Sequence, residues 1–158
     1  MKKFKNPYVV IMVGTPLSGK STVIKKKFPD AGVISRDEII LETHGSRNYN
    51  LAYEEVNHKT VDQELRDRLT AAGKGKENWV IDMTHMSPKR RKYNLSFFPD
   101  HFKVCVVMDF ITEKEYEVRN AKRVLEEDKF ISWKTVENMA SDYKSPSKEE
   151  GFNKIIFL

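Results

Sequence analysis

Two glycines, a lysine and a serine near the start of the chain have the types and the spacing needed to bind a polyphosphate. The residues from Gly14 to Ser21 fit the pattern G-x-x-x-x-G-K-[ST], and an apolar run at 9–13 precedes them. Glycine at Gly14 and Gly19 lets the backbone curl with its N–H groups pointing inward. Those donors and the positive end of the next helix can hold phosphate oxygens. We therefore predict a phosphate-binding P-loop made of Gly14, Thr15, Pro16, Ser18, Gly19, Lys20, Ser21 and Thr22.

The chemistry of this motif indicates ATP and Mg²⁺ as its ligands. Lys20 would reach the β- and γ-phosphates, and the Ser21 hydroxyl would be a ligand of the metal ion. The alternative is a chance match in a glycine-containing turn. The strand pattern before the motif and the helix pattern at 23–27 after it argue against that alternative.

The composition is that of a folded protein with a basic surface. The 158 residues are 39% hydrophobic and 32% charged, enough for one domain with a real core. The formal net charge of +5 favours a polyanionic partner.

Cysteine usage and hydropathy indicate the compartment. The one cysteine, Cys105, lies in an apolar run, so a disulfide framework or a cysteine zinc site is excluded. No apolar run reaches the length of a membrane span, and the basic N-terminus leads into a strand and not into a signal peptide. We expect a cytoplasmic protein with no membrane partner.

Apolar runs alternate with helical patterns along the chain, which predicts βαβ units and an α/β fold with a parallel sheet. The expected strands are 9–13, 31–35, 79–82, 102–108 and 155–158. The expected helices follow the P-loop and Ser35, and then cover 51–72, a segment from 87–88 onward, 112–127 and 130–143. A single domain would fill residues 1–158.

Charged residues follow two of these strands, where ligands bind in open α/β sheets. After the second strand, Asp37 could accept a proton from an attacking hydroxyl while Arg36 holds an acceptor phosphate. The alternative, which we favour less, is an ordinary acid in the first turn of a helix. After the third strand, Asp82 could support the metal shell, the substrate or the base, or it could be a plain turn acid.

Two arginines four residues apart indicate a mobile element over the phosphates. Arg119 and Arg123 would project from one face of the helix at 112–127. A helical lid that carries two guanidinium groups can neutralise the charge of a phosphoryl transition state. A solvated basic face would be the reading if no P-loop were present.

Together, the segments 14–22, 35–37, 82–85 and 119–123 resemble the polynucleotide 5′-hydroxyl kinase family. Its bacteriophage enzymes and the kinase domain of the animal polynucleotide kinase 3′-phosphatase share these segments, and the tail at 143–152 is also similar to the animal domain. The resemblance covers about residues 9–158. It is compatible with a phage-encoded protein acting in the host cytoplasm.

The resemblance implies an adenylate-kinase-like fold with a lid at about 119–131, and a role for each matching residue. Asp37 would be the general base for the 5′-hydroxyl, and Lys20 and Ser21 would serve ATP and Mg²⁺. Arg123 would contact the phosphates with support from Arg119. The acceptor site would be built by Arg36, Asp37, Asp82 and Thr84.

The chain departs from the family pattern at two positions and adds a basic segment. Ile40 occupies the position of an arginine that grips the acceptor phosphate in the phage enzyme, and His85 stands where asparagine is usual. The run at 89–92 is basic, and we expect Arg90 and Arg91 to contact a nucleic acid.

Three other functions remain open. A kinase of a small metabolite or of a tRNA-linked acceptor would share this core but would not need the basic run. A non-catalytic nucleotide-binding switch would need neither Asp37 nor the lid arginines. A toxin kinase acting on a nucleotide sugar is a further alternative.

The remaining polar and aromatic candidates have simpler explanations. His44, His58 and His101 lack metal-ligand spacing and are expected on the surface or in loops. Asp109 follows an apolar strand like a magnesium-binding acid and stays open as an outer ligand. Tryptophans 79 and 133 are expected to be packing residues.

Overall fold

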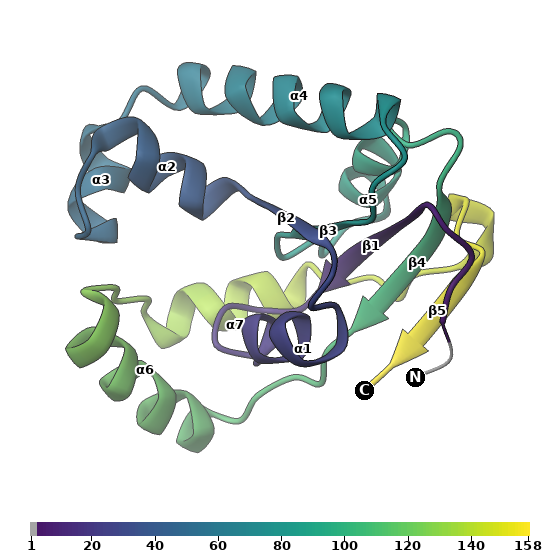
Figure 1. The fold of residues 1–158 in the computed structure, drawn as a ribbon. Helices are drawn as coiled ribbons and strands as arrows, with labels where there is room; N and C mark the ends of the chain where they lie inside the picture. Colours follow the sequence, from purple (N-terminus) through teal and green to yellow (C-terminus); the bar gives the residue numbers. More distant parts are fainter. Residues whose placement is uncertain (1–2) are drawn as a thin grey trace.

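A five-stranded parallel sheet forms the centre of the computed structural model, which describes residues 3–158 (Figure 1). The strand order is β2-β3-β1-β4-β5. The strands are β1 (Tyr8–Val13), β2 (Gly32–Ser35), β3 (Trp79–Asp82), β4 (Phe102–Val107) and β5 (Lys154–Phe157). The predicted α/β fold with a parallel sheet is confirmed, and each predicted strand lies within one residue of its observed bounds.

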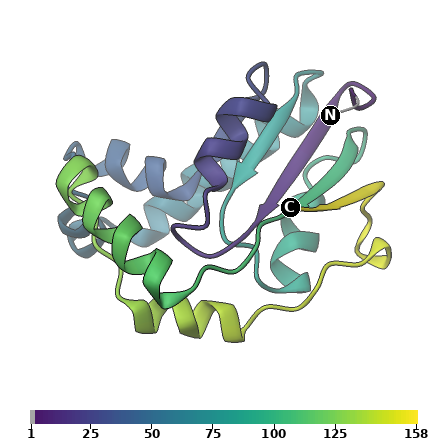
Figure 2. The same ribbon diagram turned by 90° about the horizontal axis from the view of Figure 1, so that it is seen from below.

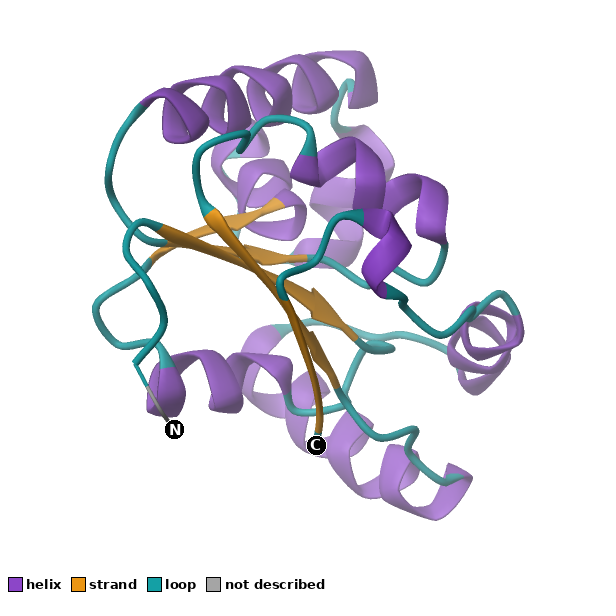
Figure 3. Ribbon diagram, turned by 90° about the vertical axis from the view of Figure 1, so that its right-hand side faces the viewer, coloured by secondary structure: helices purple, strands orange, loops and turns teal. Residues whose placement is uncertain are grey.

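Helices cover both faces of the sheet (Figure 3). They are α1 (Lys20–Lys27), α2 (Arg36–His44), α3 (Tyr49–Glu55), α4 (His58–Lys74), α5 (Pro88–Leu95), α6 (Glu113–Glu127) and α7 (Trp133–Ser141), with a 3₁₀ turn at Lys148–Glu150. No helix in the described part of the chain has both the length and the apolar character that crossing a membrane requires.

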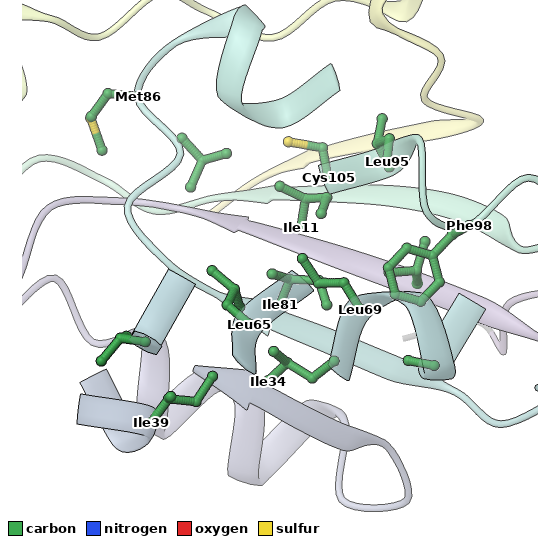
Figure 4. Packing of buried hydrophobic residues seen from close by; sticks show 14 of the residues in the cluster. Ile11, Ile34, Ile39, Leu65, Leu69, Ile81, Met86, Leu95, Phe98 and Cys105 are labelled. Carbon is green, nitrogen blue, oxygen red and sulfur yellow. The ribbon is translucent and has the colours of Figure 1, made fainter. Parts of the chain in front are cut away.

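Side chains alternate between the two faces of the buried strands, as the period of a strand requires. Val9, Ile11 and Val13 of β1 face the larger cluster, which α2, α3, α4 and α5 complete (Figure 4). Val10 and Met12 face the smaller cluster beneath α1. Cys105 is fully buried in the larger cluster, so this residue of an apolar run belongs to the core.

One predicted helix is two helices in the structure. The expected helix at 51–72 is interrupted because Val56 adopts an extended backbone and Asn57 caps α4 through its side chain. The Asn57 amide oxygen accepts the backbone N–H groups of Lys59 and Thr60. The helical periodicity at 51–72 ran across this break, since apolar residues continue on both sides of it.

Helices α6 and α7 both lie within their predicted ranges. α6 begins after Thr112, whose side chain accepts from the Glu115 N–H while the Glu115 carboxylate accepts from the Thr112 N–H, so a capping box opens this helix. α7 is shorter than the expected 130–143, because Ser132 caps it and residues 128–132 form a loop. Seen from below, α6 and α7 lie on the side of the molecule nearest the viewer (Figure 2).

The parallel arrangement brings the carboxyl ends of the central strands to one edge. Ser35 pairs in register with Asp82, and Val13 pairs with Val107. The Gly14 N–H donates to the Thr84 carbonyl (3.1 Å), which joins the loop after β1 to the loop after β3.

A buried arginine fixes the loop after β3. Arg91 is fully buried, and its Nε and Nη2 donate to the Glu150 carboxylate at 2.6 and 3.1 Å. Its Nη1 donates to the carbonyls of His85 (2.8 Å) and Met86 (3.1 Å), and Nη2 also donates to the Lys144 carbonyl (2.9 Å). All five guanidinium donors therefore have acceptors, and the C-terminal segment is attached to this loop.

We predict that Arg91→Met lowers the free energy of unfolding by about 3–5 kcal/mol, because Glu150 is then a buried charge without its partner. Urea unfolding measures this effect, and Arg90→Met, an exposed neighbour on the same helix, is the matched control. Equal stabilities of the two variants would contradict the structural role of Arg91.

Candidate active site

The P-loop has the backbone geometry that phosphate binding requires. Gly19 (φ 94°) and Leu17 (φ 66°) adopt left-handed conformations at the turn into α1. A Cβ atom at Gly14 would lie 2.6 Å from the Ser18 Oγ, so the loop has no room for a side chain there. The glycines at 14 and 19 are thus explained by local geometry.

Lys20 lies inside the loop it belongs to. Its Nζ donates to the carbonyls of Gly14 (3.0 Å) and Thr15 (2.8 Å). Burial lowers the pKa of Lys20 to about 8, against the opposing influence of the Asp82 and Asp37 carboxylates. The ammonium is therefore largely charged at neutral pH.

Two hydroxyl groups in the loop are suited to a bound phosphate. The Oγ1 of Thr15 and the Oγ of Ser18 are buried, and neither has a hydrogen-bond partner within residues 3–158. Buried hydroxyls are normally paired, so these two fit a ligand that accepts hydrogen bonds. Ser21 is exposed next to them, where its hydroxyl could bind a Mg²⁺ ion that the phosphates also hold.

Across the same pocket, Asp37 lies at the start of α2 between two donors. Lys129 Nζ lies 2.6 Å from its Oδ2, and the Tyr49 hydroxyl donates to Oδ1 at 2.8 Å. Partial burial raises the pKa of Asp37, but the ammonium and these hydrogen bonds outweigh burial and hold that pKa below its usual range. Asp37 is therefore ionised, and its side chain is still 49% exposed.

Asp82 is the second acid of the pocket. Burial raises its pKa, while the charge of Lys20 opposes that rise. Its neighbour Thr84 also lines the pocket, and the Thr84 carbonyl holds the Gly14 N–H.

His85 is a structural residue, although its segment was expected to build the acceptor site. It is buried with a positive φ of 50°, its Nδ1–H donates to the Met12 carbonyl (2.7 Å), and Asn94 Nδ2 donates to its Nε2 (2.7 Å). Burial lowers the pKa of His85 to about 4, so the ring is neutral and connects β1 to α5.

Arg36 lines the pocket, but it is already paired. Its Nε donates to Asp62 (3.0 Å), and its Nη2 lies 3.1 Å from His58 Nδ1.

The two arginines that the sequence places on a lid, Arg119 and Arg123, lie on α6 and line the pocket. Arg119 Nη1 donates to the Leu17 carbonyl of the P-loop (2.8 Å). Arg123 Nε lies 3.3 Å from Glu127 Oε2, and the charge of Arg123 also reaches Asp37 and Lys20. Helix α6 therefore brings two guanidinium groups to the wall of the pocket next to the P-loop.

These groups surround one pocket of about 840 Å³. Its wall is formed by the P-loop, the carboxylates at the carboxyl ends of β2 and β3, α3 and the segment 119–131. The predicted site residues that line it are Pro16, Gly19, Lys20, Ser21, Thr22, Arg36, Asp37, Asp82, Thr84, Arg90, Arg119 and Arg123.

The structure corrects the expectation for Arg91. That side chain is buried on Glu150 and cannot reach a nucleic acid, whereas Arg90 is exposed at the edge of the pocket. The sequence pattern 89–92 did not reveal this difference, because only one position of the run faces the interior.

Three other assignments can be compared with the structure. His101 lies in the loop before β4, as expected, but its side chain is buried, with its Nε2 3.0 Å from the Glu77 carbonyl. Asp109 is exposed and outside the pocket lining, while Trp79 packs against the core.

Sequence reasoning missed Lys129 and Tyr49. No motif contains either residue, and they lie 12 and 92 residues from Asp37 in the sequence. An aromatic residue early in a helix and a lysine after the lid helix carry no specific signal without the fold.

A protein-family model matches most of the chain. The model of a family described as an AAA domain matches residues 9–146. No curated protein sequence matches the chain at a significant level.

Several solved structures share the fold, and a gluconokinase is among them. Kti12 of Chaetomium thermophilum in complex with ADP-AlF3 has a TM-score of 0.64 at 16% identity, over 95% of this chain and 88% of that one. A gluconokinase from Sinorhizobium meliloti 1021 has a TM-score of 0.54 at 15% identity, over 98% and 83%. A Pnkp1/Rnl/Hen1 complex has a TM-score of 0.56 at 19% identity, over 73% and 40%. The predicted P-loop kinase fold is thereby confirmed.

We predict that Lys20→Met weakens ADP binding about tenfold or more, because hydrogen bonds to charged groups contribute about 1.5–3 kcal/mol. Isothermal titration with ADP measures the affinity. Lys27→Met, exposed at the other end of α1, is the control that should bind normally. Normal ADP affinity in folded Lys20→Met would remove Lys20 from the phosphate site.

Proposed function

Because the chain belongs to the AAA domain family and has the fold of a P-loop kinase, we propose that it uses ATP to phosphorylate the 5′-hydroxyl end of a polynucleotide. The observation that carries this proposal is the shared pocket in which Lys20 and Asp37 face the same space, with Arg123 on the lid side. A nucleotide-binding switch would need Lys20, but it would need neither Asp37 nor Arg123.

Each residue would have a distinct part in the transfer. Lys20 and the P-loop N–H groups would bind and orient the phosphates of ATP, and Arg119 and Arg123 would offset the charge that develops on the transferred group. Bound Mg²⁺, held by Ser21 and the phosphates, would supply further charge neutralisation.

Asp37 would orient the acceptor hydroxyl. As the 5′-oxygen bonds to the γ-phosphorus, the bond from that phosphorus to the β–γ bridging oxygen breaks and ADP leaves. The hydroxyl proton passes to the Asp37 carboxylate and then to solvent. Because phosphoryl transfer has a loose transition state, a carboxylate with a low pKa suits this orienting role.

Three observations support a polynucleotide as the acceptor. The segments 14–22, 35–37, 82–85 and 119–123 resemble those of polynucleotide 5′-hydroxyl kinases. Arg90 lies at the pocket, with Lys89 and Lys92 exposed beside it. A complex whose name includes Pnkp1 is among the similar folds.

A small-metabolite kinase is the second candidate. The gluconokinase resembles nearly the whole chain, and burial of Arg91 reduces the basic surface that a polynucleotide could contact. Arg36 is also engaged by Asp62, so it is less available for an acceptor phosphate than its position implied.

An acceptor panel tests these candidates. γ-³²P-labelled ATP would be offered with 5′-hydroxyl DNA and RNA oligonucleotides, tRNA, mononucleotides and sugar acids, with Lys20→Met as the inactive control. We expect label on oligonucleotide 5′ ends, with an apparent affinity that falls as salt rises. Label on a sugar acid alone would favour the second candidate, and no transfer to any acceptor would contradict both.

We predict that Asp37→Asn lowers kcat about 10²–10⁴-fold while KM for ATP changes little, because the carboxylate acts on the acceptor and not on the nucleotide. Steady-state kinetics measure both quantities. Asp109→Asn, an exposed acid outside the pocket, is the control. If Asp37→Asn stays active while Asp82→Asn is inactive, the base lies after β3.

A further inference from the structure

A lysine from the loop after the lid helix is buried against the acceptor side of the pocket. Lys129 is 6% exposed, although lysine is rarely buried unless it is paired. Its Nζ lies 2.6 Å from Asp37 Oδ2 and 3.8 Å from the centroid of the Tyr49 ring. It therefore makes an ion pair and a cation–π contact at once, both with residues beyond its own element.

The backbone on both sides of Lys129 is held in place. Asp128 ends α6 in a left-handed conformation with φ 49°. Phe130 and Asn50 exchange two hydrogen bonds, with the Phe130 N–H donating to Oδ1 (2.8 Å) and Nδ2 donating to the Phe130 carbonyl (3.0 Å). The Tyr116 hydroxyl donates to the next carbonyl, that of Ile131, at 2.5 Å.

The segment 119–131 makes two separate sets of contacts, one with the nucleotide side of the pocket and one with the acceptor side. Arg119 contacts the P-loop carbonyl of Leu17, whereas the loop at 128–131 contacts α2 and α3 through Asp37, Tyr49 and Asn50. The segment 119–131 therefore contacts both the nucleotide side and the acceptor side of the pocket.

We propose that Lys129 is a positioning residue, which together with Tyr49 fixes the Asp37 carboxylate in the orientation that receives the acceptor hydroxyl. The proposal rests on the proposed function for what Asp37 does, and on the observed contacts for how Asp37 is held. When the segment 119–131 lies over the site, it therefore positions Asp37 through Lys129 and also brings Arg119 and Arg123 to the phosphates.

Asp37 can still accept the acceptor hydroxyl while it is held in this way. An ionised carboxylate offers about four lone-pair sites, and Lys129 and Tyr49 use one on each oxygen. The exposed half of the side chain faces the pocket.

The charges that face Asp37 come from every element around it. Three cations favour its ionised form: Lys129 from the loop, Arg123 from α6 and Lys20 from α1. Two carboxylates oppose that form, Asp82 from β3 and Glu38 from α2. The Tyr49 hydroxyl from α3 donates a hydrogen bond to Asp37. Burial alone would raise the pKa of Asp37, so removal of the nearest cation should raise that pKa.

Carbon-13 NMR titration of the Asp37 carboxyl tests the proposal on the unliganded full chain, with Asp37→Asn to assign the signal. We expect Lys129→Met to raise the Asp37 pKa by about 1 pH unit, the low end for a nearby opposite charge because water screens a half-exposed carboxylate. Lys129→Arg keeps the charge and should leave the pKa low. Lys134→Met, exposed on α7, should change nothing.

Kinetics provide a second measurement. In Lys129→Met we expect the acidic limb of log kcat to move to higher pH by the same amount, with KM for ATP unchanged. An unmoved Asp37 pKa in folded Lys129→Met would overturn the proposal, as would a variant whose main defect is a raised KM for ATP. If wild type phosphorylates no acceptor, the proposed function fails, while the carboxyl titration still decides the role of Lys129.

Discussion

The burial of one guanidinium group is the constraint on which the site depends. Arg91 can be buried only because Glu150 and three carbonyl oxygens satisfy all of its donors. Two of those carbonyls belong to the loop that also holds β1 through His85 and the P-loop through Thr84. The placement of the phosphate-binding loop relative to the acids after β2 and β3 therefore relies on an ion pair outside the pocket.

Local features were predictable from the sequence because local chemistry determines them. The P-loop needs two glycines at a fixed spacing, a capping box needs Thr112 and Glu115 three residues apart, and a buried strand needs a run such as 102–107. Each of these patterns carries its own physical cause, so the sequence predicted the sheet, the P-loop and the position of Asp37 after a strand.

Features that depend on distant partners were not predictable in this way. Lys129 and Asp37 are 92 residues apart, and nothing near either residue indicates the other. Arg91 sits in a run of basic residues that reads as a solvated face, yet one position of that run points at Glu150. The break at Asn57 was hidden because an asparagine cap interrupts the backbone without interrupting the apolar period.

The distance in sequence between Arg91 and Glu150 also affects folding during synthesis. Glu150 lies 59 residues after Arg91, and β5, which pairs with β4, follows it. On a ribosome, where domains form as the chain emerges from its N-terminus, the P-loop and all the pocket acids are synthesised before the residue that secures their supporting loop. A nascent chain arrested before Glu150 would carry an uncompensated charge in its interior, and it would hold the parts of the pocket without the means to keep them in place.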